Sequence, residues 1–82
     1  MKTKEIIKEI EKEGIENYIN NFVLNDEEKQ ENDLLQHIEA LQEIRRKQGN
    51  NLYLIWGIIG LYAKIGDEIG RNKMLEMEKD IL

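Results

Sequence analysis

The apolar centre of this chain reads NNLYLIWGIIGLYAKIGDEIG, from residue 50 to residue 70. Ten apolar side chains stand almost without interruption between residues 52 and 63, and four glycines fall within the fourteen residues from Gly57 to Gly70. In the interior of a helix each glycine costs about 1 kcal/mol relative to alanine. A helix through this stretch therefore needs a compensating interaction, and glycine favours the close approach of a second backbone.

The spacing of these residues predicts one long helix over about residues 51–79. At 100° per residue its apolar side chains cover roughly 200° of the circumference, so we expect this helix to be central and to pack on two sides. Gly66 and Gly70 continue the apolar stripe with small-xxx-small spacing, which lets another helix approach closely. The same mapping places Gly57 and Gly60 on the polar side of the helix.

The rest of the composition also favours helices. Proline is absent and Lys, Glu, Ile and Leu are abundant, which is typical of long helices with few forced turns. We therefore expect an all-α fold, a small bundle of three to four helices in one domain over residues 1–82. A β-strand over residues 51–59 is the alternative, because that run is rich in β-forming residues. The predicted helices cover approximately residues 3–13, 15–24, 26–47 and 51–79.

Capping residues and turns set these boundaries. Gly14 either kinks one helix or separates two, and both interpretations stay open. Asn25 is a good N-cap for the third helix, whose last turn carries the cations of residues 45–47. The turn around Gly49 is short, so we expect the third and fourth helices to be antiparallel neighbours.

Several classes of protein are disfavoured. The chain has no cysteine, which excludes disulfides and fits a reducing compartment. The charged residues that follow Met1 do not form the apolar core of a signal peptide. The apolar run ends at Lys64 after twelve residues, whereas a membrane span needs about 20. We therefore expect a cytoplasmic protein without a membrane span.

Acidic residues are concentrated in one segment. The net charge is −5, and seven acids stand against the single base Lys29 between residues 25 and 43. Such a surface repels the phosphates of nucleic acids and favours a basic protein partner, although it can also be an ordinary solvated helix face. The predicted partner-binding acidic face comprises Asp26, Glu27, Glu28, Glu31, Asp33, Glu39 and Glu43.

Residues that could support chemistry are few. His37 is the only histidine and lacks companion ligands at zinc-binding spacing, so we predict no metal site, no cofactor and no catalytic residue. Carboxylates at Glu39 and Glu43, facing Asp67 and Glu68 across two helices, give the alternative of a magnesium-dependent hydrolase. The basic residues 45–47 give a second alternative, contact with nucleic acid, but complementing the helix dipole explains them better.

The leading hypothesis is a non-enzymatic protein-interaction module. An apolar arc too wide for one small bundle and a concentrated acidic helix both favour a regulator or inhibitor that binds and occludes a larger protein and forms a homodimer. Acidic helical proteins of this size and composition include phage-encoded inhibitors of host defence. A membrane-surface protein is a further alternative. Trp56 suits either a core or an interface. The residues predicted for self-association or close helix packing are Trp56, Gly57, Gly60, Gly66 and Gly70.

Overall fold

Six helical segments account for almost all of residues 3–23 and 30–81, the part of the chain that the computed structural model describes. No strand occurs within these ranges, so the all-α prediction is confirmed and the β alternative for residues 51–59 is wrong. The segments are α1 (Thr3–Glu13), α2 (Ile15–Tyr18), the π-helix η1 (Ile19–Val23), α3 (Glu31–Gln48), α4 (Leu52–Ile65) and α5 (Glu68–Ile81).

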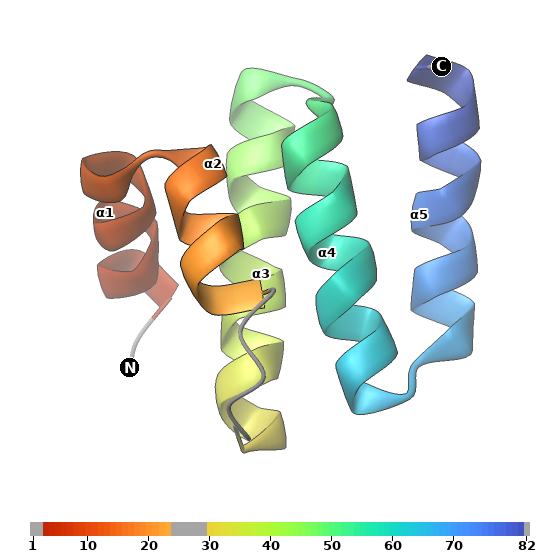
Figure 1. The fold of residues 1–82 in the computed structure, drawn as a ribbon, viewed down its shortest axis with the longest axis horizontal. Helices are drawn as coiled ribbons and strands as arrows, with labels where there is room; N and C mark the ends of the chain where they lie inside the picture. Colours follow the sequence, from red (N-terminus) through yellow and green to blue (C-terminus); the bar gives the residue numbers. More distant parts are fainter. Residues whose placement is uncertain (1–2, 24–29, 82) are drawn as a thin grey trace.

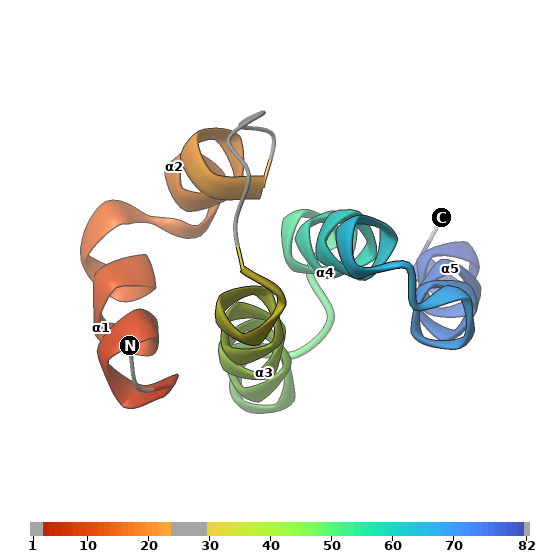
Figure 2. The same ribbon diagram turned by 90° about the horizontal axis from the view of Figure 1, so that it is seen from below.

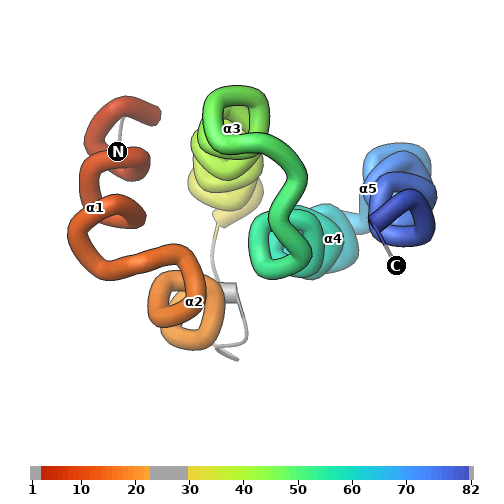
Figure 3. The backbone as a smooth tube through the Cα atoms, turned by 90° about the horizontal axis from the view of Figure 1, so that it is seen from above, coloured from red at the N-terminus to blue at the C-terminus, as the bar shows by residue number. Residues whose placement is uncertain are grey.

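The helix α4 lies in the middle of the molecule. It packs against α3 on one side and α5 on the other, and η1 and α2 contact it as well. Seen from below, α4 separates α3 from α5, which stands at the edge (Figure 2). The helix α1 lies beside α3, so α1 and α5 occupy opposite sides of the molecule (Figures 1 and 3). As predicted, α3 and α4 are neighbours joined by a short turn.

The predicted continuous helix over residues 51–79 is wrong, because α4 ends at Ile65 with Gly66 as its C-cap. This glycine has φ 77° and ψ 20°, in the left-handed region. Its N–H donates to the carbonyl of Ala63, and the N–H of Asp67 donates to the carbonyl of Tyr62. These two bonds form a Schellman motif, which satisfies carbonyl groups that the helix end would leave unpaired.

Asp67 then starts α5. Its carboxylate accepts a hydrogen bond from the backbone N–H of Gly70 at 3.0 Å, and its carbonyl accepts from the N–H of Arg71. An N-cap of this kind stabilises the first turn by about 1 kcal/mol. With the break, no helix within the described ranges is long and apolar enough to cross a membrane.

The two C-terminal glycines therefore do not form the predicted helix-packing stripe. Gly66 is the C-cap of α4, where glycine is needed for its positive φ. Gly70 lies against the ring of Tyr62 on α4, and a β-carbon at Gly70 would come within 2.7 Å of that ring. Both glycines serve the turn between α4 and α5.

The other boundaries differ less. Gly14 has φ 96° and separates α1 from α2, which decides between the two interpretations left open. The helix α3 begins at Glu31, five residues later than predicted, with Gln30 as an extended N-cap. The predicted cap Asn25 lies outside the described residues. Asn51 caps α4 as its side chain accepts from the N–H of Tyr53 at 2.8 Å.

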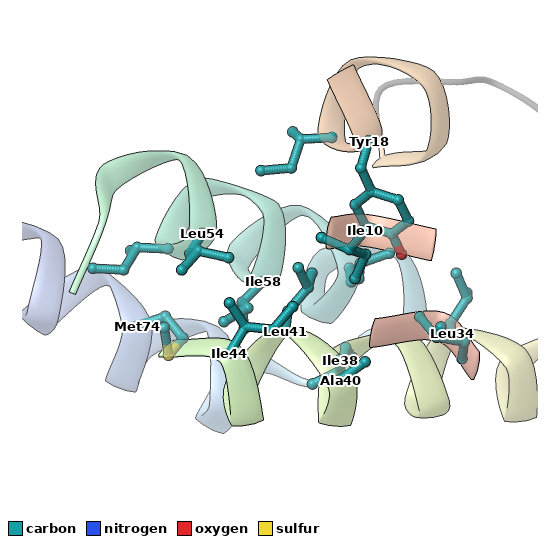
Figure 4. Packing of buried hydrophobic residues seen from close by; sticks show 14 residues of the cluster. Ile10, Tyr18, Leu34, Ile38, Ala40, Leu41, Ile44, Leu54, Ile58 and Met74 are labelled. Atoms are coloured by element: carbon teal, nitrogen blue, oxygen red, sulfur yellow. The ribbon is translucent and has the colours of Figure 1, made fainter. Parts of the chain in front are cut away.

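The core is mainly aliphatic and lies largely between α1, α3 and α4, with further side chains from α2, η1 and α5 (Figure 4). Gly57 belongs to this core, so its predicted place on a polar face is wrong. A β-carbon at Gly57 would lie only 3.0 Å from Cγ1 of Ile19 on η1, so the missing side chain lets η1 pack against α4. The buried hydrophobic residues are Ile6, Ile10, Tyr18, Ile19, Leu34, Ile38, Ala40, Leu41, Ile44, Leu54, Ile55, Ile58, Leu61 and Met74.

Candidate functional site

Two large aromatic side chains of α4 are exposed next to each other. Trp56 is 45% exposed and Tyr53 is 42% exposed, and their rings lie 5.8 Å apart in an edge-to-face arrangement. Ile81, also exposed, lies at the end of α5 that stands beside the beginning of α4 (Figure 1). Adjacent exposed aromatic residues are a recognised feature of protein interfaces.

A carboxylate of a neighbouring helix lies beside the polar atom of each ring. The indole Nε1–H of Trp56 donates to Oε2 of Glu78 on α5 at 2.6 Å. The hydroxyl of Tyr53 donates to Oε1 of Glu16 on α2 at a longer 3.5 Å. The Trp56 surface, as we call it below, consists of Glu16, Tyr53, Trp56, Glu78 and Ile81, and it joins three helices.

The neighbouring elements explain why this part of α4 faces outward. Leu54, Ile58 and Leu61 point into the core and are fully buried, whereas residues 53 and 56 stand one turn apart on another side of the helix. With α3 on the core side and α5 on a flank, that side borders the solvent. The fold thus presents the two rings from a helix that is itself firmly packed.

Trp56 is the one residue of the predicted self-association set that has a side chain, and it is 45% exposed. Its exposure means that, of the two roles considered for it, the core role is wrong. Gly60 is half-buried and shares a side of α4 with Trp56 by its spacing. The other three glycines of the set have the structural roles described above, in the core and at the turn.

The predicted acidic face is dispersed in the described part of α3. Glu31, Asp33 and Glu39 are exposed, but Asp33 lies about 120° around the helix from Glu39. Glu43 forms an ion pair with Lys47 at 3.6 Å. The same helix ends with three cations, so its charge is nearly balanced over its length. Asp26, Glu27 and Glu28 lie outside the described residues.

The carboxylates considered for magnesium are not brought together. Glu39 and Glu43 lie on α3, Asp67 caps α5 and Glu68 opens it, and α4 stands between these two helices (Figure 2). Within residues 3–23 and 30–81 no group of three or more His, Asp or Glu side chains could hold a metal ion. The predicted facing arrangement of these four residues is therefore wrong.

Of the three basic residues at the end of α3, Arg45 has a structural role. Arg45 donates from Nε to Gln42 at 2.8 Å and from a terminal nitrogen to Asn50 at 3.1 Å. Gln42 in turn donates to the sulfur of Met74 on α5. This chain of contacts ties the α3–α4 turn, α3 and α5 together, and Arg46 and Lys47 remain exposed.

His37 is buried within an aromatic stack. Its ring lies 3.9 Å from that of Phe22, nearly parallel, and its Nδ1 shares a hydrogen bond with the hydroxyl of Tyr18. Tyr18 also stacks on Phe22, with ring centroids 5.4 Å apart. The cluster joins α2 and η1 to α3, so we assign the only histidine a packing role.

Because the Tyr18 hydroxyl is buried, the free energy of unfolding should decrease at high pH. Burial, together with the charges of Glu13 and Glu9, raises the pKa of Tyr18 well above its ordinary value of 10.0. The unfolded chain therefore loses this proton first, and the stabilisation is fully present below about pH 10 and lost as the pH rises further.

We expect Tyr18 to steepen the loss of stability above pH 10. It should add up to about 1.4 kcal/mol per pH unit to the fall in the free energy of unfolding, and Tyr18→Phe should remove that contribution. Urea unfolding of both proteins from pH 8 to pH 11 measures the two slopes. Below pH 9 the two proteins should show the same slope. Equal slopes above pH 10 as well would contradict the prediction, because Tyr18 would then ionise alike in the folded and unfolded chains.

Most residues of the Trp56 surface were missed by sequence reasoning. Tyr53 and Trp56 stand at i and i+3, a spacing that indicates a shared face of a helix. Nothing in the local sequence points to Glu16 or Glu78, which reach the two rings from 37 and 22 residues away. Comparison of the chain with protein-family models, curated proteins and solved structures gives no match.

Proposed function

We propose that this chain is a non-enzymatic protein-binding module, a small regulator or inhibitor that binds a larger protein through the Trp56 surface. The exposed pair of Tyr53 and Trp56 carries this proposal. Tryptophan and tyrosine dominate the energetics of protein interfaces because they bury a large area with few rotatable bonds.

The contacts that limit the motion of the two rings support the same conclusion. A short hydrogen bond of 2.6 Å ties the Trp56 ring to α5, and a longer contact of 3.5 Å joins the Tyr53 hydroxyl to α2. Side chains that are already fixed lose little conformational entropy when a partner covers them, so more of the contact energy appears as affinity. Ile81 stands three residues after Glu78 on α5, so by its helical spacing it adds an exposed apolar side chain near that carboxylate.

Self-association through the same surface is the second candidate. In a two-fold dimer the same surface of both copies forms the interface, so the carboxylates of Glu16 and Glu78 would be brought close to the same two carboxylates of the other copy. Like charges brought together in this way oppose association, so we favour a different protein as the partner. Sedimentation at micromolar concentration separates the cases, because a strict monomer argues against the dimer.

Affinity capture from the native cell tests the function. The wild-type chain should retain a specific protein, and Trp56→Ala should weaken that binding by about 2 kcal/mol, a loss of roughly 30-fold in affinity. Ile69→Ala is the matched control, because Ile69 is 72% exposed on α5 and lies outside the Trp56 surface. Partner binding that survives Trp56→Ala unchanged, or that Ile69→Ala weakens equally, would contradict the proposal.

A further inference from the structure

We propose that the Trp56 surface binds a lysine or arginine side chain from a basic segment of its partner. The cation lies against the exposed ring faces of Tyr53 and Trp56, and the carboxylates of Glu16 and Glu78 at the two ends neutralise it. This inference rests on the proposed function and names the chemistry of the partner.

Both carboxylates retain the capacity to accept a ligand. Each takes one hydrogen bond from its aromatic neighbour, and an ionised carboxylate offers about four acceptor positions. Among the described residues neither Glu16 nor Glu78 has a cationic side chain within ion-pair distance. Two carboxylates that have no countercharge in the described part of the chain thus flank the rings.

The rings add an attraction of their own. A cation within about 6 Å of the centroid of an aromatic ring is attracted to the electron-rich face, with tryptophan the strongest partner. Trp56 and Tyr53 each expose more than two fifths of their area, and their edge-to-face packing leaves them inclined by 77°. A long side chain with an apolar stem and a charged tip suits such a surface.

The surrounding charge favours a basic partner over a second copy. The end of α5 next to Trp56 carries Glu76, Glu78 and Asp80 against Lys79, and the whole chain has a net charge of −5. A basic segment is attracted by this field, whereas another copy of the chain is repelled by it. Charge complementarity therefore selects the occupant.

The single tryptophan provides a direct reporter. The chain has only Trp56, so one indole N–H signal in a ¹H–¹⁵N spectrum follows the site alone. Titration with a seven-residue peptide of alternating arginine and glycine should shift this signal to saturation, and added salt should weaken the binding. A peptide with glutamine in place of arginine should leave the signal unmoved. Equal shifts with both peptides would overturn the proposal.

Paired variants locate the charges. The double variant Glu16→Gln, Glu78→Gln keeps an acceptor for each ring and removes both carboxylate charges, so arginine-peptide binding should weaken about fivefold to tenfold. The matched double variant Glu31→Gln, Glu39→Gln removes two exposed charges from α3 and should weaken binding less than twofold. Equal losses in the two variants would refute the site. If the first variant fails to fold, the comparison of the two peptides with the native chain decides.

The outcomes also separate this inference from the function on which it rests. An arginine peptide that never shifts the indole signal, while cellular capture still depends on Trp56, refutes the cationic ligand and leaves the protein-binding function intact. Capture that is independent of Trp56 refutes the function itself.

Discussion

Met74→Ala should lower the free energy of unfolding by about 2–5 kcal/mol, the usual range for removing a buried methionine side chain. Met74 is the one fully buried residue of α5, and its sulfur also accepts a hydrogen bond from Gln42 on α3. Since the backbone of α5 lies beside α4 alone, this side chain is the main anchor of α5. Losing it also loosens the carboxylate that holds the Trp56 indole.

Chemical denaturation followed by far-UV circular dichroism measures this loss. Met77→Ala is the matched control, because Met77 lies on the same helix but is only partly buried, so its replacement should cost clearly less. Hydrogen exchange should show the earliest loss of protection in α5 of the Met74 variant. Equal effects of the two replacements would mean that α5 is not anchored through Met74.

Gly57→Leu should destabilise the fold by about 1–3 kcal/mol, even though leucine is the better helix former by nearly 1 kcal/mol. The physical reason is overpacking, because the first added carbon would already lie 3.0 Å from Ile19 and 3.7 Å from Leu41. The larger side chain must push η1 away from α4. Phe22 follows Ile19 on the same π-helix, so this displacement would also disturb the stacking of Phe22 on His37.

Thermal or urea unfolding compares this variant with Ala63→Leu. Ala63 is exposed on the same helix, and a leucine there should change stability by no more than about 0.5 kcal/mol. A Gly57→Leu protein as stable as the wild type would show that η1 does not pack closely against α4.

The break in the C-terminal helix shows what periodicity misses. Apolar residues continue at helical spacing from Leu61 through Ile65 to Ile69, and the mapping followed them across residue 66. The local signal was the Gly66–Asp67 pair, a left-handed cap followed by an N-cap, which closes one helix and opens the next. Hydrogen bonding at the two ends outweighs the continuing apolar pattern.

The misplacement of Gly57 has the same origin. The mapping of one long helix grouped Gly57 with Asp67 and Arg71, which lie beyond the end of α4 and do not continue its helical spacing. Within α4 alone, two of the four neighbours of Gly57 one turn away are Leu54 and Leu61, and both are fully buried. Face mapping is sound inside one helix and fails across its end.

The all-α class, α1 and the α3–α4 turn followed from the sequence because capping and periodicity are local. The Trp56 surface did not, since it depends on how α2 and α5 dock beside α4. Those contacts arise from the tertiary arrangement, and no local pattern encodes which carboxylate reaches which ring.

A photo-activated crosslinking amino acid at position 53 tests the central claim most directly. With the protein partner present in the native cell, irradiation should join the partner to position 53, and the same reagent at position 69 should give no adduct. Crosslinking from position 69 or from position 39 on α3, with none from position 53, would contradict binding through the Trp56 surface.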